Sequence, residues 1–163
     1  MTPPTPLPST MAVRDLFAMT VGRDVSMVVG GEPLTPATPG GVIVGEYVTD
    51  FGSPEALIAF DIPLAAHLGA ALGLVPATAS AVAIEDGYLP ESLLDNTYEV
   101  LNIAASLFNT EGAPHLRLAA MHDSTETPLP APVANWLRGY PPRLDAAAEV
   151  KEYGGGRVSV LIK

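Results

Sequence analysis

Hydrophobic residues recur at helical spacing in some parts of the chain and alternate with polar ones in others, and these two patterns predict its elements. Positions three and four apart are apolar in three segments, which predicts helices over 11–20, 63–74 and 90–109. β-branched clusters and alternating runs predict strands over 25–29, 41–48, 56–60, 115–121, 144–153 and 157–162. The longest predicted element is the helix over 90–109, with roughly 20 residues and a length of about 30 Å.

Capping and breaking residues support the helix boundaries. Ser9 or Thr10 can cap the first helix, and Pro63 and Pro90 suit the first turns of the other two. Gly112 predicts the stop of the long helix.

The remaining segments are predicted as connections. A link rich in Pro, Ala, Thr and Ser, with one short turn, leads to Asp86-Gly87, and a turn of helix is expected near Trp136. Gly154-Gly155-Gly156 reads as the turn of a closing hairpin. Three strands, two helices, one strand and a hairpin in this order favour an α+β fold, with an antiparallel β-sheet packed against helices.

Length and local composition indicate one domain with a tail. The chain has 163 residues, and residues 1–10 hold four prolines, so we expect a flexible tail over 1–10 and a single domain over 11–163. The apolar stretch over 56–84 is interrupted by Asp61, Pro63 and Pro76, which argues against a membrane span. With no secretory signal in the first residues, a cytoplasmic protein is expected.

Charge and cysteine content exclude several classes of function. The 18 acidic and 8 basic residues give a formal charge of −10, which disfavours nucleic-acid and anionic-membrane partners. The absence of cysteine excludes disulfides, thiol catalysis and thiolate metal sites. Residues 24–116 contain twelve Asp or Glu and no Lys or Arg, so the middle of the chain is purely anionic.

The polar residues of the long helix form a regular line. Asp95, Glu99 and Asn102 follow one another at i, i+4 and i+7, within roughly 60° of one face, and Ser106 continues the line. The rest of the circumference is mostly apolar, so we expect a helix that is buried on most sides and has a narrow polar edge. Such an edge is most simply a solvated face. Asp95 and Glu99, however, repel each other at i, i+4 and have no Lys or Arg close in the sequence. This arrangement is suited to binding a cation that a partner supplies.

The segment Asp95-Asn-Thr-Tyr-Glu99-Val-Leu-Asn102 resembles the signature of the CheC/CheX/FliY chemotaxis phosphatases: Asp or Ser, then Glu four residues on, then Asn three further. The order of the predicted elements over 11–163 is similar to the CheX-like branch. The resemblance implies a CheC/CheX-like fold, a homodimer, and hydrolysis of the aspartyl phosphate on a CheY-type response regulator in two-component signalling.

The resemblance also implies a role for each residue of the line. Asn102 would orient the attacking water, and Glu99 would bind a lysine of the regulator. Asp95 and Ser106 would belong to the partner-binding surface, with Ser106 standing where the family commonly has glycine. The chain would need no metal ligands or cofactor of its own, because the Mg²⁺ ion is expected on the partner receiver domain. Since 63–74 carries no second set of these residues, at most one site per chain is expected.

A second interpretation stays open beside the phosphatase. A non-catalytic protein-protein interaction module with the same fold would dock a receiver domain or another basic partner through its acidic middle. His67, His115 and His122 are too scattered for a metal-ligand pattern, and His67 is expected to lie off the buried face of its helix.

Overall fold

Six antiparallel strands form one sheet, in the order β1-β5-β6-β3-β2-β4. The computed structural model describes residues 4–163. The strands are β1 (Val25–Val29), β2 (Val42–Thr49), β3 (Pro54–Asp61), β4 (Leu116–Asp123), β5 (Arg143–Val150) and β6 (Gly154–Ile162). Together with the helices they confirm the predicted α+β fold with an antiparallel sheet.

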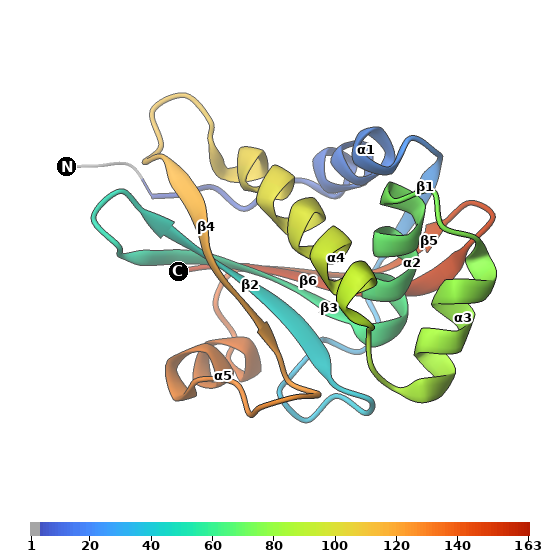
Figure 1. Cartoon of the computed structure of the whole chain (residues 1–163). Coiled ribbons are helices and arrows are strands. Elements are labelled where there is room, and N and C mark those ends of the chain that lie inside the picture. Colours follow the sequence, from blue (N-terminus) through green and yellow to red (C-terminus); the bar gives the residue numbers. More distant parts are fainter. Residues whose placement is uncertain (1–3) are drawn as a thin grey trace.

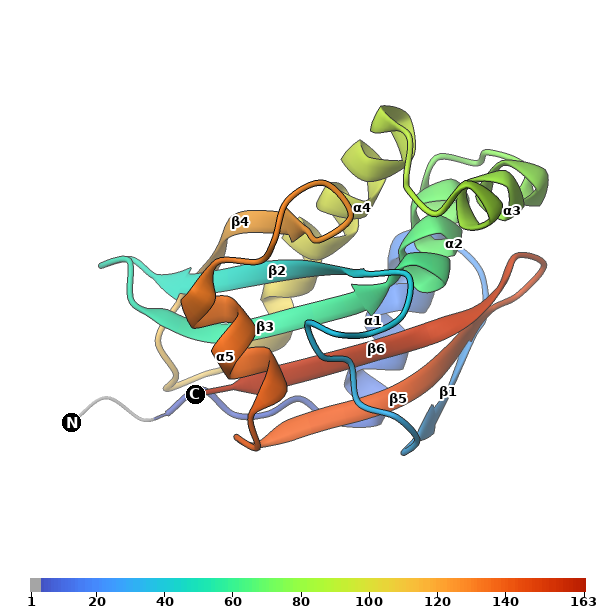
Figure 2. The same cartoon turned by 90° about the horizontal axis from the view of Figure 1, so that it is seen from below.

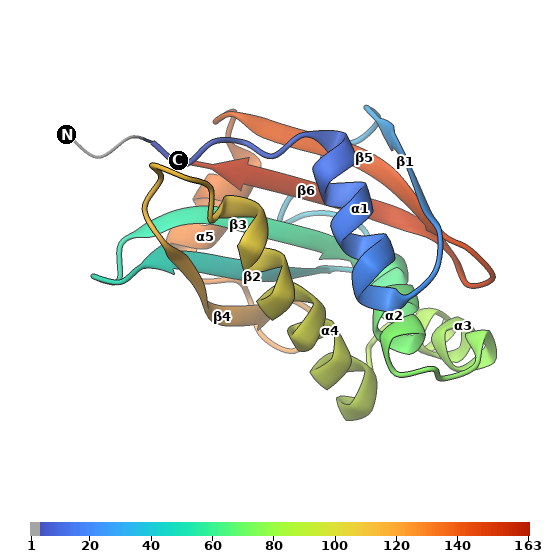
Figure 3. The ribbon, with the colours of Figure 1, turned by 90° about the horizontal axis from the view of Figure 1, so that it is seen from above.

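The two faces of the sheet are covered differently (Figures 1 and 2). The helices are α1 (Thr10–Val21), α2 (Ile62–Leu72), α3 (Ala77–Asp86), α4 (Glu91–Ala104) and α5 (Ala131–Arg138), with a 3₁₀-helix η1 (Ala105–Phe108). α1, α2 and α4 lie over one face, as seen from above in Figure 3. α5 and the loop over 30–41 cover part of the opposite face, while α3 packs against α2.

Buried apolar side chains fill the space on both faces. The larger cluster lies between the sheet and α1, α2 and α4, and includes the edge-to-face pair of Phe17 and Phe60, whose ring centroids are 5.7 Å apart. The smaller cluster joins Leu34 of the 30–41 loop and Val133 and Leu137 of α5 to the other face. The sheet is therefore buried on both sides at its centre, where β3 and β6 are neighbours.

The strand order has an internal symmetry. If β1, β2 and β3 change places with β4, β5 and β6 respectively, the strand order becomes β4-β2-β3-β6-β5-β1. This is the original order read from the opposite edge of the sheet. Each set of three strands follows a helix, α1 in the first half and α4 in the second. The fold thus contains two helix-plus-three-strand halves, and α1 is the topological counterpart of α4.

Two connecting segments differ from their predictions. The link before Asp86-Gly87, expected to hold one short turn, is the ten-residue helix α3, and the turn near Trp136 is the eight-residue α5. Pro76 and Pro130 stand at their N-caps. Both helices bury only two residues each, and α3, made mostly of small side chains, has no clear apolar stripe.

The closing hairpin turns earlier than predicted. Gly154, Gly155 and Gly156 lie within β6, paired with β5, and residues 151–153 form the turn. Two of the three glycines are needed because α2 crosses them: a Cβ on Gly154 would lie 2.6 Å from His67 Nε2, and one on Gly156 would lie 2.5 Å from Leu64 N. A contact with α2, and not a turn, accounts for Gly154 and Gly156.

The segment before α1 packs against the domain. Ser9 caps α1 by accepting a hydrogen bond from Ala12 N at 3.1 Å, as expected. Thr5 is buried and Leu7 contacts the larger cluster, so part of the expected flexible tail is ordered against the core. Residues 1–3 of that tail lie outside the described residues. Among residues 4–163, no helix is long and apolar enough to cross a membrane.

Candidate functional site: the outer face of α4

The helix α4 packs on the sheet through one side. Pro90 is its N-cap and Glu91 lies in its first turn, where a carboxylate favours the helix dipole. The buried side consists of residues at helical spacing, namely Leu93, Thr97, Val100, Leu101 and Ala104. This spacing fixes which side of α4 faces outward.

Polar contacts with α2 hold α4 in place. The hydroxyl of Thr97 lies 3.0 Å from the carbonyl oxygen of Ala65, and Asn96 Nδ2 donates to the carbonyl oxygen of Gly69, also at 3.0 Å. Gly69 lets the two helices approach closely, since a Cβ there would lie 2.8 Å from the carbonyl oxygen of Leu93. No local sequence pattern marks Asn96 and Thr97 as contact residues, because their partners on α2 lie 27 and 32 positions away.

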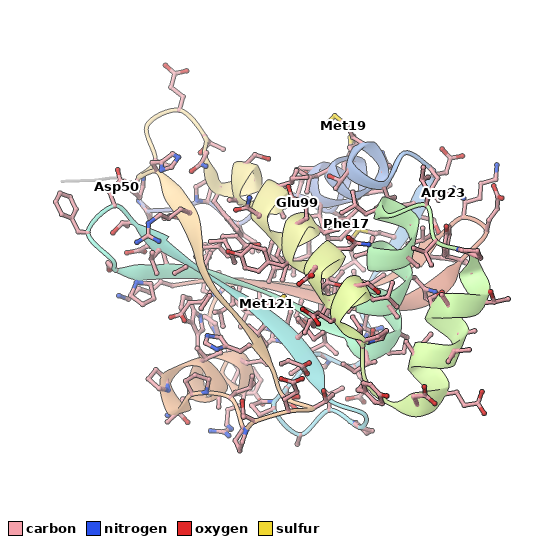
Figure 4. The ribbon with its side chains drawn as sticks, viewed as in Figure 1. Phe17, Met19, Arg23, Asp50, Glu99 and Met121 are labelled. Carbon is pink, nitrogen blue, oxygen red and sulfur yellow. The ribbon has the colours of Figure 1, made fainter. Side chains whose placement is uncertain are left out.

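The structure brings Asp95, Glu99 and Asn102 together on the outer side of α4, and all three are exposed. Figure 4 shows Glu99 on this helix. The exposed surface is wider than predicted, because Tyr98 and Ile103, expected on the buried circumference, are 42% and 38% exposed. α4 contacts the protein on one side only, so its apolar residues next to the line remain in solvent. In place of the predicted narrow polar edge, α4 therefore has a broad exposed face that includes apolar side chains.

Ser106 is exposed too, but it does not lie on the α-helix. The helix predicted to reach Asn109 ends at Ala104, and residues 105–108 form η1. A 3₁₀ turn advances about 120° per residue, against about 100° in an α-helix. Ser106 is therefore turned about 80° from Asn102, where a continuous α-helix would place it about 40° away.

The outer face of α4 is strongly negative. Glu85 and Asp86 at the end of α3 lie one loop before Glu91, Asp95 and Glu99 of α4. Within residues 4–163, the ion pairs involve other residues, and none of these five carboxylates takes part in one. Carboxylates without an internal counter-ion are available to a cation from outside.

The histidines lie apart from α4's outer face. His67 was expected off the buried face of its helix, and this is wrong: it is buried, with Nδ1 3.0 Å from Ser80 Oγ of α3. Helix α2 lies between the sheet, α3 and α4, so nearly all its sides are covered. His122 pairs with Glu46 at 3.1 Å, and His115 lies 3.5 Å from Asp50.

Comparison with known proteins identifies the fold. No protein-family model matches the sequence, and no curated protein matches it. FliY of Thermotoga maritima superimposes with a TM-score of 0.55 at 13% identity, covering 93% of this chain and 82% of that one. FliM in the FliM–SpeE complex of H. pylori gives 0.55 at 8% identity, covering 93% and 80%.

A complex from Borrelia burgdorferi is also similar. The matched chain of its CheX–CheY–BeF3–Mg²⁺ structure has a TM-score of 0.52 at 13% identity, and the match covers 93% of each chain. These likenesses span nearly the whole of the present chain. The protein therefore has the fold of the CheC/CheX/FliY family, which FliM shares.

Proposed function

We propose that this protein is a CheX-like phosphatase, which hydrolyses the aspartyl phosphate of a CheY-like response regulator. One observation carries the proposal: Glu99 and Asn102 are both exposed, on adjacent turns of α4, in a fold shared with a CheX crystallised with CheY. They are the residues that the family signature assigns to lysine binding and water orientation. Within residues 4–163, neither Glu99 nor Asp95 takes part in an ion pair.

The chemistry suits an amide and a carboxylate on one helix. Water attacks the phosphorus, the bond to the aspartyl oxygen breaks, and phosphate and a free carboxylate are formed. Such transfer depends mainly on positioning and charge stabilisation, so a helper protein needs no nucleophile. The Asn102 carboxamide offers a donor and an acceptor for water and does not repel the phosphoryl oxygens, because it is neutral.

The other residues serve docking. Glu99 binds the active-site lysine of the receiver domain as a charge-assisted pair. Asp95, one turn earlier, adds negative charge on the same side, and Ser106 lies at the far end of the surface. The receiver domain supplies the phosphorylated aspartate and Mg²⁺, and the reaction takes place in the cytoplasm.

The fold provides one such face per chain. The topological counterpart of α4 is α1, whose outward residues include Met11, Asp15 and Met19. A neighbouring carboxylate and carboxamide are absent from this described helix. We therefore propose a single active face, on α4.

Phosphate release from a phosphorylated receiver domain tests the proposal. Wild-type protein should accelerate release above the spontaneous rate, and Asn102→Ala should return it to that rate. Glu111→Ala, which removes an exposed acid outside α4, is the matched control and should behave as wild type. Equal release with wild type and Asn102→Ala, both at the spontaneous rate, would show that the protein is not this enzyme.

The likeness to FliM favours a second candidate, a non-catalytic docking module. That FliM was crystallised in complex with SpeE, so the fold also serves protein-protein assembly. Under this alternative the acidic face binds a receiver domain or another basic partner. Binding without accelerated release in the same assay would select it.

We also propose a homodimer formed through the β1 edge of the sheet. β1 pairs with β5 on one side, and its Val28 and Val29 are 71% and 59% exposed. An open edge strand with exposed β-branched residues is suited to pairing with a second copy. Light scattering should give twice the chain mass for wild type and the monomer mass for Val28→Lys.

A further inference from the structure

Tyr47 links the central sheet to the turn of α4 that carries Asn102. Its side chain is fully buried, and its hydroxyl donates a hydrogen bond of 2.6 Å to the carbonyl oxygen of Leu101. Its ring also packs on Phe108 of η1, with centroids 5.1 Å apart. Burial raises the pKa of the Tyr47 hydroxyl well above its usual value, so the group keeps its proton and remains a donor.

This hydrogen bond occupies an acceptor that an α-helix uses for itself. In a continuing helix the carbonyl of Leu101 would accept from the N–H of Ala105. Here that N–H donates to the carbonyls of Asn102 and Ile103, and the chain continues as η1. The change from α-helix to 3₁₀-helix therefore occurs where the tyrosine hydroxyl has replaced the amide.

The change from α-helix to 3₁₀-helix alters which side chains lie next to Asn102 on the outer face of α4. Ser106 is turned about 40° further from Asn102 than an uninterrupted α-helix would place it. Serine is larger than the glycine that the family commonly has at this position, so its location affects how closely a partner can approach.

We propose that Tyr47 is a positioning residue of the active face, which holds the start of η1 and so keeps Ser106 turned away from Asn102. The proposal rests on the proposed function, because it assumes that a receiver domain docks on this face. It assigns a role in docking to a buried residue on β2 that cannot touch the partner. It also accounts for a serine being tolerated at position 106.

The test compares a variant that lacks the Tyr47 hydroxyl with a control variant that lacks the hydroxyl of another tyrosine. Tyr47→Phe keeps the ring but frees the carbonyl of Leu101. Tyr153→Phe is the control, because its hydroxyl also donates to a main-chain carbonyl, that of Val75 beyond α2, at 2.6 Å. Amide hydrogen exchange should show stronger protection of the Ala105 N–H in Tyr47→Phe only, since this amide can then bond to Leu101.

Kinetics give the second readout. Tyr47→Phe should lower kcat/KM for phosphate release about tenfold, mainly through KM, because a misplaced group at a docking surface weakens binding. Adding Ser106→Gly to Tyr47→Phe should restore most of the loss. Tyr153→Phe should retain the wild-type KM.

The two proposals fail in different ways. Unchanged exchange at Ala105 in Tyr47→Phe, or no rescue by Ser106→Gly, would overturn the role of Tyr47 even if Asn102→Ala abolishes activity. If Tyr47→Phe does not fold, the affinity of the Ser106→Gly variant for the receiver domain is the test. A marked gain over wild type would mean that Ser106 obstructs docking even with Tyr47 in place, which would overturn the role of Tyr47. If wild type shows no activity, the proposed function fails, while the exchange experiment still reports on η1.

Discussion

A Cβ on Gly69 of α2 would lie 2.8 Å from the carbonyl oxygen of Leu93 on α4. The contact shows that glycine at this position sets the distance between the two helices. We predict that Gly69→Ala costs about 1–3 kcal/mol, because a methyl group in a closely packed contact forces the helices apart. Urea unfolding measures this loss.

Gly139→Ala is the control for this substitution, because a Cβ there would meet no atom closer than 3.4 Å. A free energy of unfolding unchanged by Gly69→Ala would mean that the helices can move apart without cost. Since α4 carries the proposed active face, we also expect Gly69→Ala to reduce phosphate release more than its effect on stability explains.

Removing the carboxylate of Glu99 should weaken the complex with a receiver domain. We expect Glu99→Ala to raise Kd at least about tenfold, because a desolvated charge pair with the partner's lysine is lost. The difference from wild type should shrink as salt is raised, since exposed charges are screened. Titration calorimetry at two salt concentrations checks both points, and an affinity equal to that of the Glu111→Ala control would contradict the role of Glu99.

The guanidinium of Arg143 joins three parts of the opposite face. It pairs with Asp145 at 2.9 Å and donates to the main-chain carbonyls of Leu137, Gly139 and Leu34 at 2.8–3.1 Å. We predict that Arg143→Ala costs about 3 kcal/mol or more, because it leaves a nearly buried carboxylate without its cation. Thermal unfolding should show the loss.

Arg138→Ala, at an exposed position on α5, is the control for Arg143 and should stay within about 0.5 kcal/mol of wild type. Because Arg143 lies on the face away from α4, phosphate release per folded molecule should be unchanged. A fall in that specific activity would indicate coupling between the two faces of the sheet.

The buried His67 should make stability depend on pH. Burial lowers the pKa of its imidazole below the usual 6.5, so the unfolded chain takes up the proton first as pH falls. The contribution of neutral His67 to the free energy of unfolding is thus fully present above about pH 6.5. It is lost as the pH falls toward the lowered pKa of the folded protein. Urea unfolding from pH 8 to pH 5 should show the decline.

His67→Asn keeps a polar atom near Ser80 but cannot titrate, so its stability should fall less over this range. Parallel curves for wild type and His67→Asn would assign the pH dependence to other groups.

Leu74 occupies a position that favours glycine. It has φ of 55° at the end of α2, where Val75 N donates to Ala70 O at 2.9 Å, and it is 79% exposed. We predict that Leu74→Gly stabilises the protein by about 1 kcal/mol, because glycine adopts the left-handed conformation without strain. Leu74→Ala keeps a Cβ and should give no such gain, and calorimetry distinguishes the two.

Local patterns in the sequence were sufficient for most of the sheet and for three helices. Apolar alternation located β2, and Pro63 and Pro90 marked the starts of α2 and α4. The same patterns placed Asp95, Glu99 and Asn102 on one exposed side, because helix periodicity alone determines which side chains share a face. These features depend on neighbours within a few residues.

The missed features depend on distant parts of the chain. α3 has mostly small side chains and buries only Ser80 and Ala83, so no hydrophobic stripe marks it. The end of α4 is set by Tyr47, which lies 54 residues before its partner Leu101. Gly156 is explained by the approach of α2, which no local pattern contains.

The symmetric strand order has a consequence for how the chain folds. The edge strand of each half pairs with the other half, β1 with β5 and β4 with β2. The ordered sheet therefore requires contacts between residues more than a hundred positions apart, which slows folding and makes it depend on both halves. If the chain were cut between η1 and β4, β1 in one fragment and β4 in the other would each lose their one partner strand, and the six-stranded sheet would form only when the two fragments associate.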